Sequence, residues 1–157
     1  MNIVTRLIGI LGVLFSCITW AQTAPDVSFD SFTDKTSFKL SELHGKVVYV
    51  DFWASWCGPC RKSLPLYENI YQQYKDQGLV ILGVNLDQVE KDALRFMEKL
   101  EVSYPLVKGN DVAAKAFGVS AMPSSFLIGR DGNILHKHLG FRKGDEELIK
   151  KWIEESL

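Results

Sequence analysis

The segment KVVYVDFWASWCGPC, residues 46–60, restricts this 157-residue chain to few folds. Its first eight residues form an almost continuous apolar run rich in valine and aromatic residues, as expected for a strand buried on both faces of a sheet. Asp51 interrupts that run, and Cys57 and Cys60 follow it. A Cys-x-x-Cys pair between a buried strand and a helix indicates thiol redox chemistry in a fold of alternating strands and helices.

The rest of the chain continues this alternation. Apolar runs predict strands, and apolar residues three or four apart predict helices. The predicted order is helix, strand, helix, short strand, short helix, two strands and a helix, at residues 60–75, 79–86, 90–100, 104–109, 111–118, 124–129, 133–140 and 144–156. Asp111 is expected to cap the short helix, and Asp131-Gly132 to turn the last two strands into a hairpin.

Two short segments ahead of residue 46 alternate apolar and polar residues. They are DVSFDSF (26–32) and TSFKL (36–40), and they predict a small antiparallel extension. The complete order predicts an α/β fold, in which a parallel core sheet with an antiparallel edge carries helices on both faces.

The first 21 residues have a different character from the rest. Arg6 precedes a 15-residue apolar run, and Thr19 and Ala21 are spaced as a cleavage signal. The run is short for a membrane-spanning helix, which needs about 20 apolar residues. We predict a signal peptide at 1–21 and one domain at 22–157. An uncleaved N-terminal anchor, lipidation at Cys17 and a buried core helix are the alternatives.

Export would leave Cys57 and Cys60 as the only cysteines of the mature chain. Exported proteins usually use disulfides to close long loops. A disulfide that spans two intervening residues gives little chain-entropy stabilisation, so we interpret this pair as a redox centre. At the start of a helix, the thiol of Cys57 faces unpaired N–H groups that favour its thiolate, and Cys60 lies one turn further on.

These residues resemble the active site of the thioredoxin superfamily, and the resemblance covers the chain from about residue 25 to its end. The N-terminal extension and the stretch 87–110 are similar to the exported TlpA/ResA-like branch, in the wider redoxin group. The resemblance implies a three-layer sandwich, a central mixed sheet flanked by helices, with an N-terminal β extension and a helical insert. It also implies reduction of disulfides outside the cytoplasm, in the periplasm or its equivalent, often in cytochrome c assembly.

Individual positions carry roles over from this resemblance. Cys57 matches the attacking thiol, Cys60 the resolving thiol, and Asp51 the buried acid that moves protons for the second cysteine. Pro123 matches the proline whose preceding peptide bond is cis in this family. The expected substrate-binding surface comprises Trp56, Gly58, Pro59, Met122 and Pro123, and Trp53 is expected in the core.

Two departures from the family pattern bear on the proton route. Gly83 stands where thioredoxins have the lysine that partners the buried acid. Ser63 stands where ResA-like proteins tend to have a glutamate. An aspartate in a dry strand is expected to have a raised pKa, which suits a proton shuttle near neutral pH. The alternative is that Asp51 ends the strand and faces solvent.

Other functions are less consistent with the residues. A zinc site could combine both cysteines with His136 and His138, but the pattern lacks a second Cys-x-x-Cys, and such strand histidines are usually exposed. A peroxiredoxin-type peroxidase would need a different cysteine motif, and a non-catalytic binding module would not need the two thiols. We expect no cofactor, and the net charge of −1 gives no reason to expect nucleic acid as a partner.

The dipeptide between the cysteines bears on the direction of the reaction. Gly58-Pro59 is the dipeptide of reducing thioredoxins, so the resemblance favours a reductant. The expected partners are disulfide-containing protein substrates and a membrane thiol carrier that supplies electrons, with a possible tether through the N-terminus.

Overall fold

The computed structural model of the chain describes residues 22–32 and 36–157. The predicted signal peptide, its cleavage site after Ala21 and the lipidation candidate Cys17 therefore lie outside the described residues. Within those two ranges, no helix is both long enough and apolar enough to cross a membrane.

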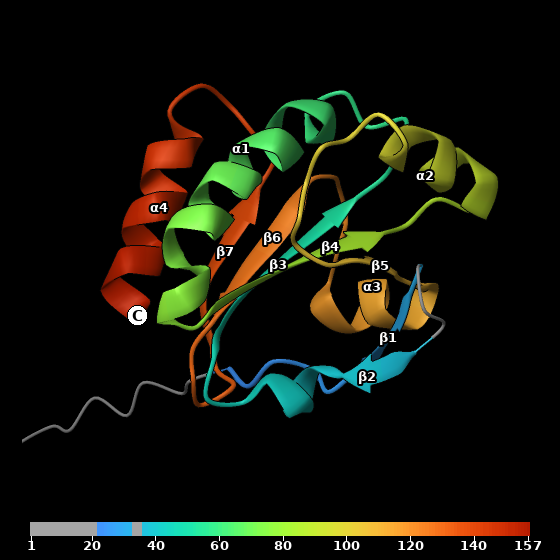
Figure 1. The fold of residues 1–157 in the computed structure, drawn as a ribbon. Helices are drawn as coiled ribbons and strands as arrows, with labels where there is room; N and C mark the ends of the chain where they lie inside the picture. Colours follow the sequence, from blue (N-terminus) through green and yellow to red (C-terminus); the bar gives the residue numbers. More distant parts are fainter. Residues whose placement is uncertain (1–21, 33–35) are drawn as a thin grey trace, which may run out of the picture.

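One seven-stranded mixed sheet forms the centre of the molecule (Figure 1), with the strand order β2-β1-β5-β4-β3-β6-β7. The strands are β1 (Ser28–Ser31), β2 (Ser37–Lys39), β3 (Val47–Trp53), β4 (Leu79–Asn85), β5 (Leu106–Lys108), β6 (Ser124–Ile128) and β7 (Ile134–Leu139). β3, β4 and β5 are parallel to one another, and the outer strands pair antiparallel. All seven residues of β3 are buried, as its continuous apolar run predicts.

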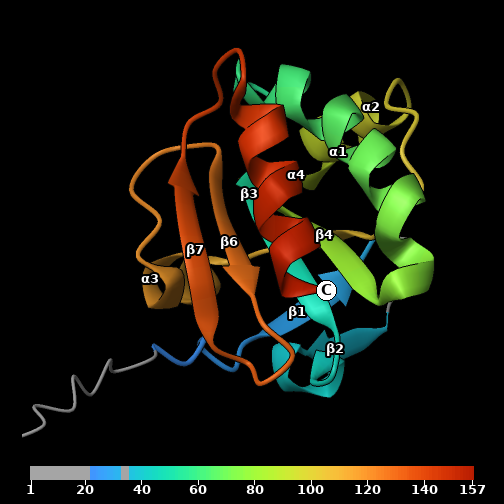
Figure 2. The same ribbon diagram turned by 90° about the vertical axis from the view of Figure 1, so that its left-hand side faces the viewer.

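Helices cover both faces of this sheet, as the sequence predicts. They are α1 (Cys60–Tyr74), α2 (Glu90–Met97), α3 (Asp111–Phe117) and α4 (Asp145–Ser156), with 3-10 turns η1 (Leu40–Leu43) and η2 (Lys75–Gln77). Side chains of α1, α2 and α4 join one hydrophobic cluster, and side chains of α3 and η1 join a second. Figure 2 shows α1 and α4 side by side over one face of the sheet, with α3 on the other.

The two clusters are separated by the alternation of side chains along β3. Tyr49 and Trp53 point into the cluster beneath α1, and Val50 and Phe52 point into the cluster on the α3 side. Asp51 lies two residues from Tyr49 and two from Trp53 along the strand, so its side chain points to the same face, the one that α1 covers. The expectation that Trp53 is a core residue is confirmed, because its side chain is fully buried.

Three details differ from the sequence predictions. The cap of α3 is Asn110, whose Oδ1 accepts a hydrogen bond from the N–H of Ala113 at 2.8 Å, and Asp111 is the first helical residue instead. Helix α2 ends at Met97 instead of residue 100, because the chain continues in tight turns. The predicted extension forms, and β1 also pairs with β5, which joins it to the main sheet.

Candidate active site

The two cysteines of the motif form a disulfide where β3 leads into α1. Cys57 lies in the turn before the helix, and Cys60 is the first helical residue. The backbone N–H of Cys60 donates to the Sγ of Cys57, at an N–S distance of 3.2 Å. A free N–H at the start of a helix stabilises negative charge, so this contact favours the thiolate of Cys57 after reduction.

The two sulfurs differ in their access to solvent. Cys57 retains 4% of its surface, and Cys60 is completely buried within the cluster beneath α1. The neighbours in sequence have the exposure that a docking surface needs: Trp56 is 67% exposed, and Gly58 and Pro59 are exposed as well. Cys57 is therefore the cysteine with some access to solvent, next to the exposed Trp56, whereas Cys60 is shielded completely.

Asp51 is completely buried, and the alternative that it faces solvent is wrong. Its Oδ1 accepts a hydrogen bond from the hydroxyl of Ser125 at 2.6 Å, and its Oδ2 has no partner among the described residues. Burial raises the pKa of Asp51 to about 7, although the nearby hydroxyls of Ser125 and Tyr67 oppose that effect. A carboxyl group with this pKa can both accept and release a proton near neutral pH.

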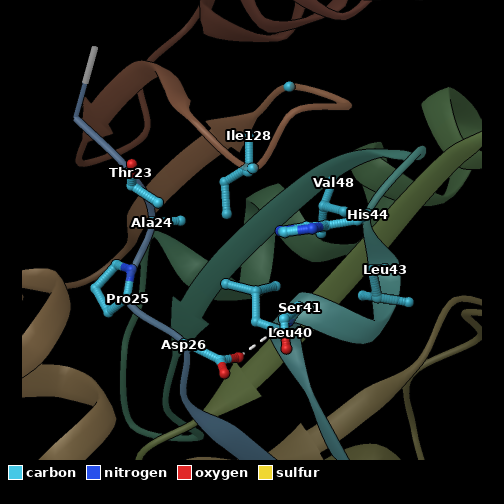
Figure 3. Close-up of a pocket in the computed structure, with 12 residues that line it drawn as sticks. Thr23, Ala24, Pro25, Asp26, Leu40, Ser41, Leu43, His44, Val48 and Ile128 are labelled. Carbon is cyan, nitrogen blue, oxygen red and sulfur yellow. Dashed lines mark hydrogen bonds between the residues drawn. The ribbon is translucent and has the colours of Figure 1, made fainter. Parts of the chain in front are cut away.

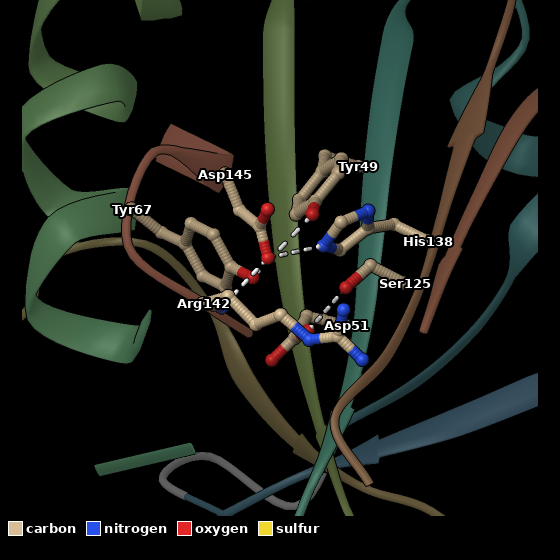
Figure 4. A network of polar contacts seen from close by, with 7 residues as sticks. All are labelled: Tyr49, Asp51, Tyr67, Ser125, His138, Arg142 and Asp145. Atoms are coloured by element: carbon tan, nitrogen blue, oxygen red, sulfur yellow. Dashed lines mark hydrogen bonds and ion pairs between the residues drawn. The ribbon is translucent and has the colours of Figure 1, made fainter. Parts of the chain in front are cut away.

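A row of polar residues crosses the sheet at the level of Asp51 (Figure 4). Asp51 on β3 is in register with Ser125 on β6, and Ser125 is in register with His138 on β7. The Nε2 of His138 lies 3.0 Å from the Oδ2 of Asp145 at the start of α4, and that carboxylate also accepts from the N–H of Arg142 at 2.6 Å. Neither Ser125 nor Asp145 was predicted from the sequence to be part of the site.

Buried tyrosines surround the same carboxyl group. The hydroxyls of Tyr49 and Tyr67 lie 3.4 Å apart, and Tyr104 donates its hydroxyl to the carbonyl of Leu64 at 2.9 Å. Burial, followed by the charge of Asp51, raises the pKa of all three tyrosines. They stay protonated, so they act only as neutral hydrogen-bonding groups. The spacing of Tyr49 from Asp51 on one strand was the available signal in the sequence.

The position of the missing lysine is filled by core side chains. Gly83 is in register with Asp51 on the neighbouring strand. A Cβ atom at Gly83 would lie 2.5 Å from the Cδ2 of Leu106 and 3.3 Å from the Nε1 of Trp53. There is therefore no space for a lysine here, and the departure noted in the sequence reflects a different packing around the acid.

The second departure, Ser63, is also a buried position. Its hydroxyl donates to the carbonyl of Cys60 at 3.3 Å, within the first turn of α1. Because this hydroxyl is buried and donates to the helix backbone, Ser63 cannot exchange protons with solvent. Asp51 is the acid on the face of β3 that α1 covers.

The loop before β6 completes the site. The peptide bond between Met122 and Pro123 is cis, which confirms the expectation from the family resemblance. Pro123 is buried, and its carbonyl accepts a hydrogen bond from the N–H of Gly140 at 2.8 Å. Met122 packs against the hydrophobic cluster that contains both cysteines, as does Phe141. The structure therefore places this loop and the disulfide against one common cluster.

The candidate zinc ligands are not gathered into a metal site. Within the described ranges, no three side chains of His, Cys, Asp or Glu form a group that could hold a metal ion. The two strand histidines are half-buried instead of exposed. His136 stacks on Trp152 with ring centroids 4.4 Å apart, and His138 meets the edge of the same indole at 5.9 Å.

A separate cavity of about 130 Å³ lies at the other end of the sheet (Figure 3). Residues 23–26, η1 and the turn between β6 and β7 line it, largely with apolar side chains. Asp26 at its edge accepts a hydrogen bond from the N–H of Ser41 at 3.1 Å. This cavity has no contact with the cysteine pair, so it is not part of the candidate active site.

Comparisons with known proteins agree with this geometry. The model of the Redoxin family matches residues 20–151. Proteins named thiol-disulfide oxidoreductase ResA are 35% identical over 120 residues in Halalkalibacterium halodurans and 36% identical over 119 residues in Bacillus subtilis. Each alignment covers 75% of this chain and 66% of the relative, so the chain matches just under two thirds of their length.

Solved structures show the same fold. A putative thiol:disulfide interchange protein DsbE from Chlorobium tepidum has a TM-score of 0.82 and 38% identity, covering 87% of this chain and 96% of that one. A putative protein disulfide isomerase from Bacteroides thetaiotaomicron has a TM-score of 0.77 and 32% identity, covering 90% and 91%. The predicted thioredoxin-like α/β fold is confirmed.

Proposed function

Because this chain belongs to the Redoxin family and has relatives named thiol-disulfide oxidoreductases, we propose that it exchanges the Cys57–Cys60 dithiol with disulfides of substrate proteins. The observation that carries the proposal is the unequal pair at the start of α1: Cys57 accepts an N–H at its sulfur and keeps a small exposed area, and Cys60 is completely buried beside it. This arrangement suits a two-step exchange.

The first step forms a mixed disulfide. The thiolate of Cys57 attacks one sulfur of the substrate disulfide, a new S–S bond forms, and the second substrate sulfur leaves as a thiolate. The N–H of Cys60, which lies 3.2 Å from Sγ in the oxidised protein, stabilises the attacking thiolate. The exposed position of Trp56 allows the substrate to approach on that side.

The second step releases the substrate. The thiol of Cys60 loses its proton and attacks the Sγ of Cys57, so the Cys57–Cys60 disulfide forms and the substrate leaves as a dithiol, two electrons richer. We assign the proton to Asp51, since it is buried on the face that α1 covers and its pKa is about 7. The row through Ser125 orients the carboxyl group for this role.

Substrate binding is assigned to the residues around Cys57. Trp56, Gly58 and Pro59 form one border, and Met122 and Pro123 form the other. Pro123 has no N–H, so it leaves the neighbouring backbone free to pair with an extended substrate segment. The apolar thioether of Met122 can pack beside the substrate disulfide without a polar contact of its own.

The cellular location and the direction of the reaction are proposed from the sequence pattern. The signal-like segment 1–21 supports a location outside the cytoplasm, in a periplasm or its equivalent, and Gly58-Pro59 supports reduction over oxidation. Each turnover leaves Cys57 and Cys60 oxidised, so a membrane thiol carrier must return two electrons. Reduction of cytochrome c precursors during their assembly is the role that best fits this combination.

The experiment uses the reduced protein and its Cys60→Ser variant. The parent should reduce insulin disulfides in the presence of dithiothreitol, and Cys60→Ser should accumulate a mixed disulfide through Cys57, detected by mass spectrometry. Cys57→Ser should do neither. If the parent shows no rate above dithiothreitol alone, or if Cys57→Ser forms the same adduct, the assignment is wrong.

A further inference from the structure

A cleft of about 320 Å³ lies beside the exposed tryptophan of the active site. It is lined by Ser55, Trp56, Arg61, Asp92, Arg95, Phe96 and Lys99, which we call the α2 cleft. The loop from β3 to α1 forms one side and α2 forms the other, and Figure 1 shows this loop passing beside α2. The cleft therefore continues the surface around Cys57 onto the helical insert.

The charges that line the α2 cleft are mainly positive. Arg61, Arg95 and Lys99 are cationic, and Asp92 is the only acid among its lining residues. Asp92 lies 3.7 Å from Arg95, and both side chains are about half exposed or more, so this pair is weakly held. Lys99 makes no ion pair with any residue of the described ranges.

Two acids near the cleft are engaged by other residues, and the exposed Glu98 and Glu101 of the same segment do not line it. Glu90 of α2 pairs with Lys108 on β5 at 2.7 Å. Asp87 is occupied by the N–H and the hydroxyl of Ser55, both at 2.9 Å. The lining of the cleft thus carries three cations and one acid, and Lys99 has no ion pair within the described ranges, whereas the chain as a whole is nearly neutral.

Within the cleft, Arg61 is held in place beside an aromatic ring. The guanidinium of Arg61 donates to the carbonyl of Ser55 from Nε at 3.0 Å and from a terminal nitrogen at 2.9 Å. The same group lies over the ring of Phe96, 5.6 Å from its centroid, and Phe96 packs on Trp53 at 5.4 Å. This preformed arrangement joins a fixed cation to exposed aromatic surface, the combination that binds an apolar side chain beside an acid.

From these contacts we infer that the α2 cleft selects substrate proteins in which acidic side chains and an apolar residue flank the reactive disulfide. The inference rests on the proposed exchange reaction and names its substrate class. The apolar residue packs on Trp56 and Phe96, and the carboxylates face Arg95 and Lys99. Opposite charge around a cleft raises the rate of encounter and fixes orientation, and both effects weaken with salt.

The test compares three disulfide peptides of one sequence, with two Glu, two Gln or two Lys flanking the disulfide. The reduced parent should have a kcat/KM for the Glu peptide about three- to tenfold above that for the Gln peptide at low salt, as expected for two surface ion pairs. The Lys peptide should be the slowest. At about 1 M salt, where the screening length is about 3 Å, the ratios should approach one.

Two double variants distinguish an effect of the cleft cations from an effect of the total charge of the protein. Arg95→Gln with Lys99→Gln should bring the ratio of Glu to Gln peptide close to one, and comparing this ratio between parent and variant cancels the intrinsic reactivity of each peptide. Lys46→Gln with Lys115→Gln removes equal charge from exposed sites ahead of β3 and on α3, and it should leave the ratio unchanged. No rate with any peptide would refute the proposed reaction. An equal rate with all three, or a ratio that the cleft variant does not alter, would refute the inference alone.

Discussion

Replacement of Asp51 by asparagine tests whether a buried, uncompensated acid lies under α1. At neutral pH the parent must keep this side chain either charged in a dry site or protonated against its ordinary pKa. Asparagine has nearly the same shape and no charge. We expect Asp51→Asn to increase the free energy of unfolding at pH 8 and to change how that free energy depends on pH.

The magnitude follows from the environment of the carboxyl group. A rise in pKa from the ordinary 3.8 to about 7 corresponds to at most about 4 kcal/mol, at about 1.36 kcal/mol per pH unit. Asparagine keeps the acceptor for Ser125, but its amide nitrogen replaces Oδ2, which has no partner among the described residues. An unsatisfied buried amide costs about 1–3 kcal/mol, so we expect a net gain of about 1–3 kcal/mol at pH 8.

The sign of the pH dependence is fixed by the direction of the pKa change. The folded protein holds this proton up to about pH 7, whereas the unfolded chain loses it near pH 4. Between these values folding takes up a proton, so the contribution of Asp51 to stability declines as the pH rises. Below about pH 4 and above about pH 7, its contribution no longer changes.

The measurement is urea unfolding of the oxidised parent and variant, followed by circular dichroism from pH 4.5 to 8.5. The difference, variant minus parent, should rise by up to about 1.36 kcal/mol per pH unit and level off above pH 7. Asp76→Asn, at an exposed aspartate in η2, is the matched control and should give a flat difference. If the free energies of unfolding of Asp51→Asn and the parent change with pH in parallel, burial does not raise the pKa of the Asp51 carboxyl group. The proposed state of Asp51 would then be wrong.

Four further outcomes are expected. In turnover assays, Asp51→Asn should lose about 10²-fold or more at pH 8 and less at pH 6, because the general base is missing; an unchanged pH profile would exclude a proton relay. Pro123→Ala should slow mixed-disulfide formation with a peptide more than Met122→Ala does, at matched folded fraction, because it adds an N–H beside the proposed groove; equal rates would remove this loop from the substrate site. Gly83→Ala should lower the free energy of unfolding by about 1–3 kcal/mol, measured in urea, because its methyl group meets packed side chains; an unchanged midpoint would contradict that packing. N-terminal sequencing of the exported protein should begin at Gln22, and a modified Cys17 at the terminus would establish the lipidated alternative instead.

The order of elements, the position of the cysteine pair and the exposure of the residues next to it could be predicted from local sequence. Continuous apolar runs specify buried strands, and a spacing of three to four specifies helix faces, because each pattern depends only on the geometry of its own element. The position of Cys57 and Cys60 at the start of α1 followed from that order. The burial of Trp53 and the exposure of Trp56 followed from it as well.

Residues brought together from separate strands could not be predicted in this way. The sequence does not show that Ser125 would donate to Asp51, that Asp145 would pair with His138, or that Trp53 and Leu106 would fill the space next to Gly83. Each of these contacts depends on the register between strands that are far apart in the chain. Local patterns along this sequence determined which residues could react and which element carries each of them. Only the tertiary structure decided which groups surround the buried acid and the cysteines, because register and packing depend on the whole sheet.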